Sequence, residues 1–287
     1  MATPDAGKYE DIVGALSGKF TGKVKMTPPS AANAAPKYGK ILQACGMIGA
    51  AHSTTGYSYT PLKSGERVTM TWWIIDVSRG GTPTGIAHKL VGCMGSCKIG
   101  AAGVGKPVEI EFTFTGKIAA TADLASGALA TLVVFNSADT VQPYILTNAT
   151  MVAVGTTQAI SSFSLDIGNE IQPEINTADA TGYDLFAIAE RNPVFNYNPL
   201  KQSVAVYDME DKVKTMVKGS YTLTLDKAID VKFTVCNGQP IAAKGVTREG
   251  AQAWDTTVKC LRNGIDGSVT TAGIVVEAPY EILFGSK

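Results

Sequence analysis

The 287-residue sequence is short of charge. Charged residues make up 17% of the chain, below the usual quarter, and 25 basic residues are balanced by 25 acidic ones. A chain with no basic excess lacks the attraction for phosphate backbones that free-standing DNA- and RNA-binding proteins need, which argues against that class. The scarcity of charge instead indicates a surface that largely contacts other protein.

Long apolar runs are also missing. The strongest, around Trp72–Ile75, falls far short of the ~20 residues that a membrane-spanning helix needs. Residues Met1–Gly22 are polar and Gly-rich, without the apolar core of a signal peptide. We therefore expect a soluble protein that is made in a cytoplasm and has no membrane partner.

The cysteines are five, an odd number, and most stand in apolar or strand-like surroundings. This setting predicts buried thiols in a reducing compartment. Cys93 and Cys97 are separated by three residues, and no second Cys pair or His cluster completes a tetrahedral metal site. Alternation along a strand places both on one face, which favours burial over a metal or redox role. The remaining cysteines are Cys45, Cys236 and Cys260.

Groups suited to catalysis are few. Neither of the two histidines, His52 and His88, lies close to a nucleophile motif, and no G-x-S-x-G elbow is present. The segment Gly100–Lys106 has the spacing of a phosphate-binding loop, G-x-x-x-x-G-K. However, Pro107 replaces the Ser or Thr that would hold magnesium, and an alternating strand follows where a helix would be needed. We therefore predict a Gly-rich β-turn at this segment.

Several carboxylates remain as candidates for an acid pair of the kind that glycosidases use. Spacing in the sequence does not by itself show such a pair, and the solvated faces of strands account for these residues adequately. We therefore expect no enzyme, no metal site and no cofactor. The candidates are Asp76, Glu109, Glu111, Asp166 and Glu170.

Alternation of apolar and polar residues dominates the rest of the chain. In Val108–Thr115 every even-numbered side chain is apolar and the others are Glu or Thr, which is typical of a strand with one wet face. Helices are predicted at Ala35–Ala44 and Asp208–Lys218, the second with Asp208 as N-cap and Gly219 as its stop. Many short strands between Gly-rich turns predict a mainly antiparallel β fold. The other expected strands are Tyr57–Leu62, Val68–Val77, Ser161–Ile167, Tyr183–Ala189, Tyr221–Leu225, Val231–Val235 and Ile274–Glu277.

The two halves of the chain resemble each other. In both, a helix is followed by a strand carrying Ser-Tyr-Thr and then by a further strand, with Ser58–Thr60 in the first half and Ser220–Thr222 in the second. This order predicts two similar modules, residues 1–155 and 156–287, each of normal domain size. A chain without duplication remains the alternative.

Two further features are predicted to contact a partner. Trp72 and Trp73 present one large ring to each face of a strand, so we expect one of them in the core. The other would meet a second sheet, a ligand or a neighbouring subunit, and the scarcity of charge favours the subunit. A loop far longer than a hairpin needs follows them, which is typical of contact elements, with a merely mobile loop as the alternative. The loop comprises Ser78, Arg79, Gly80, Gly81, Thr82, Pro83, Thr84 and Gly85.

A series of short motifs follows from Ile41 onward. They are I-L-Q-A-C-G at 41–46, Y-S-Y-T-P at 57–61, H-K-L-V-G-C-M-G-S at 88–96, G-K-P at 105–107, E-F-T-F-T-G at 111–116, S-L-D-I-G-N at 164–169 and E-R-N-P at 190–193. In their order and spacing they resemble the tail tube (major tail) proteins of long-tailed bacteriophages, over about Ile41–Pro199. The chain departs from the family in Met47, where an aromatic residue is usual, and in the Cys93 to Cys97 spacing.

The resemblance implies a fold. Each module would be a tail-tube-type β-sandwich with a helix at its side, and strands from about six modules would close into a ring whose inner wall is one continuous β-barrel. Barrel closure removes exposed strand edges, and stacking of rings buries surface, which fits the scarcity of charge. Three duplicated chains or six single ones would complete a ring. We favour three, because 287 residues exceed one module.

The resemblance also implies a function. Stacked rings would form the tail tube of a virion, assembled from a protein made in the host bacterial cytoplasm. Double-stranded DNA would pass through the lumen without specific binding, so we expect Asp and Glu there and the basic residues at interfaces. The tape-measure, terminator and distal tail proteins would be further partners. The loop Ser78–Gly85 is expected to pack against the next ring or subunit.

Two other readings remain open. One is a different β-rich virion protein, such as a tail terminator, baseplate or capsid decoration protein. The other is a carbohydrate-binding or hydrolytic β-sandwich, with Trp72 or Trp73 and a carboxylate pair as its site.

Overall fold

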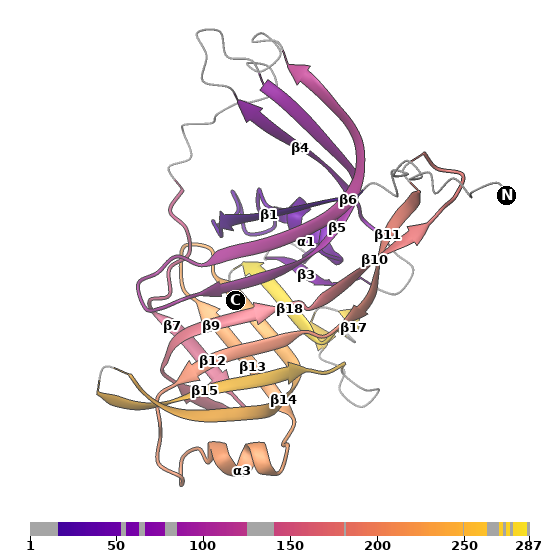
Figure 1. The fold of residues 1–287 in the computed structure, drawn as a ribbon. Helices are drawn as coiled ribbons and strands as arrows, with labels where there is room; N and C mark the ends of the chain where they lie inside the picture. The colour runs from indigo at the N-terminus through magenta and orange to yellow at the C-terminus, as the bar shows by residue number, and fades with distance from the viewer. Residues whose placement is uncertain are drawn as a thin grey trace, which may run out of the picture.

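A computed structural model describes residues 17–52, 56–62, 67–77, 85–124, 141–180, 182–248, 250–262, 270–271, 274–275 and 278–285. In these ranges the chain is mainly β, with antiparallel sheets and two short helices, which confirms the predicted fold class at that level (Figure 1). The helices are α1 (Gly39–Ala44) and α3 (Met209–Lys214). The strands are β1 (Ser17–Lys25), β2 (Met47–His52), β3 (Gly56–Pro61), β4 (Met70–Val77), β5 (Gly85–Ala101), β6 (Glu109–Leu124), β7 (Ala149–Ala153), β8 (Thr156–Gln158), β9 (Ile160–Asp166), β10 (Asn169–Ile175), β11 (Tyr183–Arg191), β12 (Val194–Pro199), β13 (Gly219–Leu225), β14 (Val231–Arg248), β15 (Ala251–Cys260), β16 (Thr270–Thr271), β17 (Ile274–Val275) and β18 (Tyr280–Gly285).

Most strands belong to one 14-stranded sheet. Its main path runs β1-β6-β5-β9-β12-β15-β14-β13-β7-β8, while β18 pairs with both β14 and β3, β2 pairs with β3, and β4 pairs with β5. The path ends at β1 on one side and at β8 on the other. No barrel therefore closes within the part of the chain that the structure describes.

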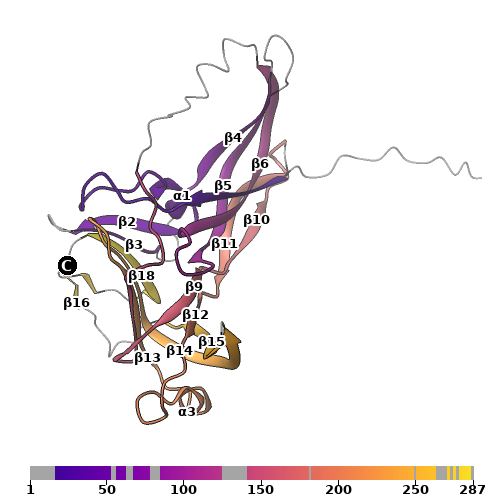
Figure 2. The same cartoon turned by 90° about the vertical axis from the view of Figure 1, so that its left-hand side faces the viewer.

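The long strand β14 passes from one layer of the molecule to the other (Figure 2). Its residues up to 238 pair with β13, and those from 231 to 235 also pair with β18. Residues 239–248 pair with β15 and with no other described strand. We call β1, β6, β5, β9, β12, β15 and residues 239–248 of β14 the seven-strand layer. The strands β13, β18 and β3 and the first part of β14 form the layer behind it.

Aromatic side chains hold the two layers together. The ring of Phe163 in β9 lies 5.3 Å from that of Phe233 in β14, and the ring of Tyr197 in β12 lies 5.9 Å from that of Tyr221 in β13. All four side chains are buried. Such pairs stabilise a fold by about 0.5–1.5 kcal/mol beyond the area that they bury. The hydrophobic core therefore fills the space between the layers.

The hairpin between β5 and β6 contains the segment Gly100–Lys106. Gly105 takes the left-handed conformation, with φ of 74°, and its N–H donates to the carbonyl of Leu146 at 3.1 Å. The N–H of Lys106 donates to the carbonyl of Gly103, also at 3.1 Å. The segment connects two strands and no helix follows it, so the predicted Gly-rich turn is confirmed.

The first helix is shorter than the sequence predicted. It begins at Gly39 rather than Ala35. Pro36 accounts for the exclusion of Ala35, because a proline disfavours helical backbone angles in the residue before it. The chain then makes a turn, in which the N–H of Gly39 donates to the carbonyl of Pro36 at 2.8 Å, before the helix begins. The helix then runs to Ala44 as expected, and Gly46, with φ of 76°, ends it.

The second helix has the predicted start and a different end. Asp208 is the N-cap, and its side chain accepts a hydrogen bond from the N–H of Asp211 at 2.9 Å. The helix stops at Lys214, because Met216 takes a left-handed φ of 51°. Gly219, the expected stop, is instead the first residue of β13. A non-glycine residue in this conformation is uncommon, which is why the sequence pointed to the glycine.

The same strand order occurs twice in the seven-strand layer. β1 precedes α1 in the chain and pairs with β6, the second strand of the β5–β6 hairpin; β12 precedes α3 and pairs with β15, the second strand of the β14–β15 hairpin. Likewise, β4 pairs with the first part of β5 and β13 with the first part of β14. The predicted boundary between residues 155 and 156 falls in the turn between β7 and β8. The division into two modules remains a prediction.

β10 and β11 form a separate hairpin that leaves the sheet beyond β9 and β12 (Figures 1 and 2). The chain turns at Gly168, which has φ of 61° and donates its N–H to Asp166 Oδ1 at 2.9 Å. A Cβ atom on Gly168 would lie 2.2 Å from the carbonyl oxygen of Asn192. Both the backbone conformation and this close approach therefore require glycine at 168. At the far end of the hairpin, Lys117 Nζ of β6 forms an ion pair with Asp179 at 2.8 Å.

Replacing this glycine tests that requirement. Gly168→Ala is expected to lower the free energy of unfolding by about 2–4 kcal/mol, because the clash adds to the left-handed backbone penalty of roughly 1–2 kcal/mol. Gly155→Ala is the matched control, since Gly155 has φ of 79° but nothing within 4 Å of its Cβ position. Urea unfolding of both full-length variants measures the difference. If both variants lose the same free energy of unfolding, the close approach to Asn192 does not contribute to the requirement for glycine.

Candidate functional site

The outward face of the seven-strand layer is polar. In β1 the odd-numbered residues are exposed, among them Lys23, while the even-numbered ones, such as Val24, are partly buried. In β6, Glu111 is exposed whereas Ile110 and Phe112 on either side are buried. Successive side chains of a strand point to opposite faces, so the alternation read from the sequence produces one wet and one buried face.

Two shallow depressions lie side by side in this face. The first has a volume of about 540 Å³ and the second of about 500 Å³, and both are lined by Lys98 and Glu111. Asp166 lines the first, and Ser164 and Asn196 line the second. The face is therefore lined by polar side chains from β6, β5, β9 and β12. The lysines, carboxylates and amides on it can pair with one another or with a polar partner.

One row of facing residues across the layer contains five charged side chains, and we call it the charged row. Each member lies directly opposite the next in the register of neighbouring strands, where Cβ atoms are about 4.5–5.5 Å apart. Starting at β1, the charges of the first four side chains alternate between positive and negative. An uncharged residue, one further positive residue and a second uncharged residue complete the row. The row is Lys23, Glu111, Lys98, Asp166, Val194, Lys259 and Gln239.

An ion pair joins Lys23 Nζ to Glu111 Oε1 at the β1 end of the charged row. The hydrogen bond and the charge of Glu111 raise the pKa of Lys23 above its usual value, and Glu109 adds to the effect. Both partners are well exposed, with 62% and 49% of their side-chain surface open, so the pair stabilises the fold little and less at high salt. Its main effect is to cancel charge on the face.

The next row contains mostly small or uncharged residues. Lys25 and Glu109 are opposite each other at the β1 end, and no other charged residue follows. Beyond them the row continues through Gly100, Ser164, Asn196, Thr257 and Ala242.

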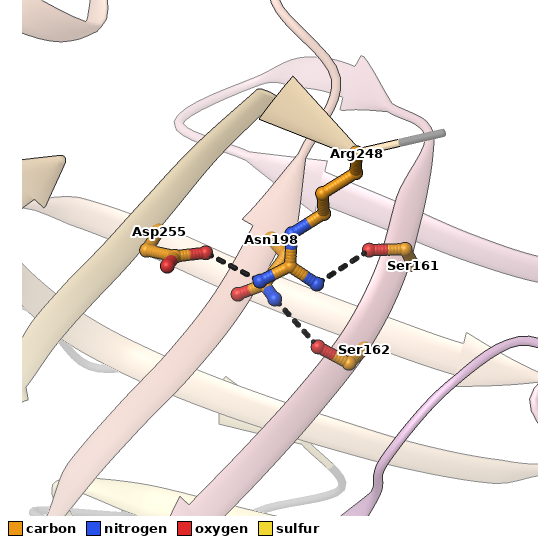
Figure 3. A network of polar contacts seen from close by, with 5 residues as sticks. All are labelled: Ser161, Ser162, Asn198, Arg248 and Asp255. Carbon is orange, nitrogen blue, oxygen red and sulfur yellow. Dashed lines mark hydrogen bonds and ion pairs between the residues drawn. The ribbon is translucent and has the colours of Figure 1, made fainter. Parts of the chain in front are cut away.

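Arg248 closes the far end of the polar face (Figure 3). Its Nη2 atom donates to Asp255 Oδ1 at 2.7 Å, and its Nη1 atom donates to Ser161 Oγ at 3.4 Å. In the orientation drawn, the amide nitrogen of Asn198 donates to Ser162 Oγ at 2.7 Å. Rotation of that amide by half a turn lets its oxygen accept from Arg248 Nη1 at 2.8 Å and Nη2 at 2.6 Å. Either way, the guanidinium connects the tip of β14 to β15 and β9.

Loss of this guanidinium is expected to weaken the hairpin tip. Arg248→Ala should lower the free energy of unfolding by about 1 kcal/mol, since the contacts are partly exposed. Arg248→Lys should recover less than half of that loss, because one ammonium group cannot reach the same acceptors at once. Urea unfolding provides the measurement, with the exposed Lys218→Ala as control. Full recovery by lysine would mean that charge alone matters.

The cysteines are buried and unpaired. Cys45, Cys93, Cys97 and Cys260 are free thiols with almost no exposed surface, and Cys236 is partly buried. Cys93 and Cys97 share the buried face of β5, as predicted. Burial raises the pKa of Cys93 to about 11 and that of Cys260 to about 12. The thiolate is the reactive form, so these side chains are inert at neutral pH.

This protection predicts a labelling pattern. With iodoacetamide at pH 8, Cys236 should react first in the folded protein, and slowly, because burial raises its pKa as well. The four buried thiols should react only after unfolding in urea, where all five become equivalent. Mass spectrometry of digested protein identifies the labelled positions. Rapid labelling of Cys93 or Cys260 in the folded chain would contradict their burial.

The two tryptophans lie on opposite faces of β4. Trp72 is partly buried, and its ring stacks on Phe112 with centroids 5.5 Å apart and lies 5.0 Å from the ring of Phe20. Trp73 is 47% exposed, and Lys89 Nζ lies 5.1 Å from the centre of its ring. In the figures, β4 and the adjoining parts of β5 and β6 extend away from the body of the molecule (Figures 1 and 2). Contact of Trp73 with a neighbouring subunit remains a prediction.

The predicted contact loop lies almost wholly outside the described residues, which end at Val77 and resume with Gly85, the first residue of β5. Its role also remains a prediction.

Of the candidate carboxylates, three share the polar face, and the neighbours of each in the register are lysines or uncharged residues. They are Glu109, Glu111 and Asp166.

The lysines of the polar face were not predicted as site residues from the sequence. Lys98 and Lys259 each have one neighbour from a distant part of the chain: Asp166 lies opposite Lys98, and Val194 lies opposite Lys259. The alternation in the sequence could have placed Lys23 on an exposed strand face, because lysines recur at odd positions in Ser17–Lys25.

Among the described residues, no group of three or more His, Cys, Asp or Glu side chains is placed to hold a metal ion. No described helix is long and apolar enough to span a membrane. No protein family model matches the chain, and no curated protein sequence matches it either.

Proposed function

We propose that this protein is a tail tube protein of a long-tailed bacteriophage, which assembles into stacked rings around a channel for double-stranded DNA. The observation that carries the proposal is the seven-strand layer, with its polar outward face and a free strand edge at each end. The ordered motifs from Ile41 to Pro193 support the same class. The assignment to the tail tube proteins depends on those motifs, and the proposed assembly into rings depends on the two free strand edges.

The two free edges suit ring closure. Among the residues that the structure describes, β1 pairs only with β6, and residues 239–248 of β14 pair only with β15. A free edge presents unpaired N–H and C=O groups, which proteins usually blunt or cover. Pairing of one edge with a neighbouring copy satisfies these groups, and repetition around an axis closes a barrel with the polar face inward.

Backbone groups that point outward from the β14 edge can be identified. The carbonyl of Gln252 in β15 accepts from the N–H of Lys201 at 2.9 Å, so it points away from β14. Its opposite residue, Thr247, therefore directs its own backbone groups away from β15. Gly245, two residues along the same strand, does so too.

The repeated strand order supports a ring of three chains. Each chain contributes β1-β6-β5 and β12-β15-β14, with β9 between them. Three copies would then supply six equivalent units, while six copies remain the alternative if the repetition has another origin. Copies of the same chain are thus the main partner, and terminator, tape-measure and distal tail proteins follow from the family resemblance. The assembled protein would reside in the virion tail.

Blocking one free edge tests the proposal. Gly245→Pro removes an N–H that points to the edge and no hydrogen bond to β15, so the variant should fold normally and fail to form tubes. Gly245→Ala keeps the N–H and should assemble. Negative-stain electron microscopy measures assembly, and thermal unfolding checks the fold.

Several outcomes would contradict the proposal. Wild-type protein that forms neither rings nor tubes at any concentration would remove the tube function. Closed single rings without stacking would favour a tail terminator instead. Tubes of Gly245→Pro that match those of the wild type would exclude the β14 edge from ring closure.

A further inference from the structure

Lysines lie on the very face that would line the channel. Lys19, Lys23 and Lys25 of β1, Lys98 of β5 and Lys259 of β15 all point outward from the seven-strand layer. The sequence-based expectation placed basic residues at interfaces and acidic ones in the lumen. Each lysine–phosphate contact would hold DNA in place, since it releases counterions and stabilises the complex. A channel with these lysines therefore needs a means of keeping DNA mobile.

Carboxylates stand beside the central lysines. Lys23 forms an ion pair with Glu111, and Lys98 lies opposite Glu111 on one side and Asp166 on the other. The two lysines and two carboxylates of this set sum to zero charge. Lys25 has Glu109 opposite it in the next row.

The spacing of these groups makes the cancellation effective at the distance of a phosphate. Neighbouring strands lie about 4.8 Å apart, and charges in solution are screened beyond a Debye length of about 8 Å at physiological salt. A phosphate that approaches Lys98 therefore experiences both flanking carboxylates, whereas charges elsewhere on the protein are screened. The zero net charge of the whole chain would not produce this local cancellation if the carboxylates lay on another surface.

We infer that Glu111 and Asp166 mask Lys23 and Lys98 from DNA, so that this part of the polar face contacts duplex DNA without retaining it. This inference rests on the proposed function, because it assigns the polar face to the channel. The ion pair with Glu111 holds the ammonium group of Lys23 near the face. Within the charged row, the alternation of sign leaves no run of positive charge for a phosphate backbone to follow. Removal of the carboxylates would expose two lysines per chain in one row.

The test removes the two negative charges and retains the side-chain shapes. In Glu111→Gln with Asp166→Asn, the amide oxygen at 166 still accepts from the N–H of Gly168. Unassembled full-length protein, isolated by size exclusion, is titrated into a fluorescent DNA duplex and binding is followed by anisotropy. The double variant should bind at least about tenfold more tightly than the wild type at low salt. Its log affinity should fall with log salt about 1.8 more steeply, at about 0.9 for each of two phosphate contacts.

A control with the same change in net charge separates masking from overall charge. Glu210→Gln with Asp226→Asn removes two exposed carboxylates, one on α3 and one after β13, outside the polar face. This control should bind DNA as weakly as the wild type. Adding Lys23→Gln and Lys98→Gln to the first double variant should return its affinity to the wild-type value.

Three results would overturn the inference. They are tight binding by the wild type, equal gains in the control and the test variant, and persistence of the gain after the two lysines are removed. Tube assembly of each variant is recorded separately by electron microscopy. Wild-type tubes without the expected gain in DNA binding would remove the masking role alone, while absence of wild-type rings and tubes would remove the proposed function.

Discussion

Strand register is the constraint on which the rest of the structure depends. A slip of one residue between β6 and β5 would turn Glu111 or Lys98 toward the core and bring Phe112 or Cys97 to the surface. The aromatic contacts behind the layer, such as Phe163 with Phe233, make such a slip costly. The buried face thereby fixes the register, and the register aligns the charges on the exposed face. Packing inside the molecule thus determines what a partner meets outside it.

The sequence predicted local features well and long-range pairing not at all. Val108–Thr115 was recognised as a strand with one wet face, but β6 continues to Leu124 because β5 pairs with it that far. For β14 the alternation indicated only Val231–Val235, since Gly238 and Pro240 resemble strand breakers. The structure absorbs them with a register shift between Pro240 and Ala242 and continues to Arg248.

The candidate site shows the same division. Glu109, Glu111 and Asp166 were each identified as members of solvated strand faces, which is where they lie. The alignment of Asp166 with Lys98 depends on β9 pairing with β5 across more than sixty residues of chain. No spacing in the sequence records that pairing. The zero net charge of the whole chain was visible at once, yet its meaning lies in the local order of opposite charges in one row.

The sharing of β14 between two layers has a mechanical consequence. Its first part is hydrogen-bonded within one layer and its last part within the other, so the covalent backbone crosses between them. If the layers slid past each other under shear, this strand would have to stretch or its ladders would have to break together. A chain arranged in this way resists deformation as one body.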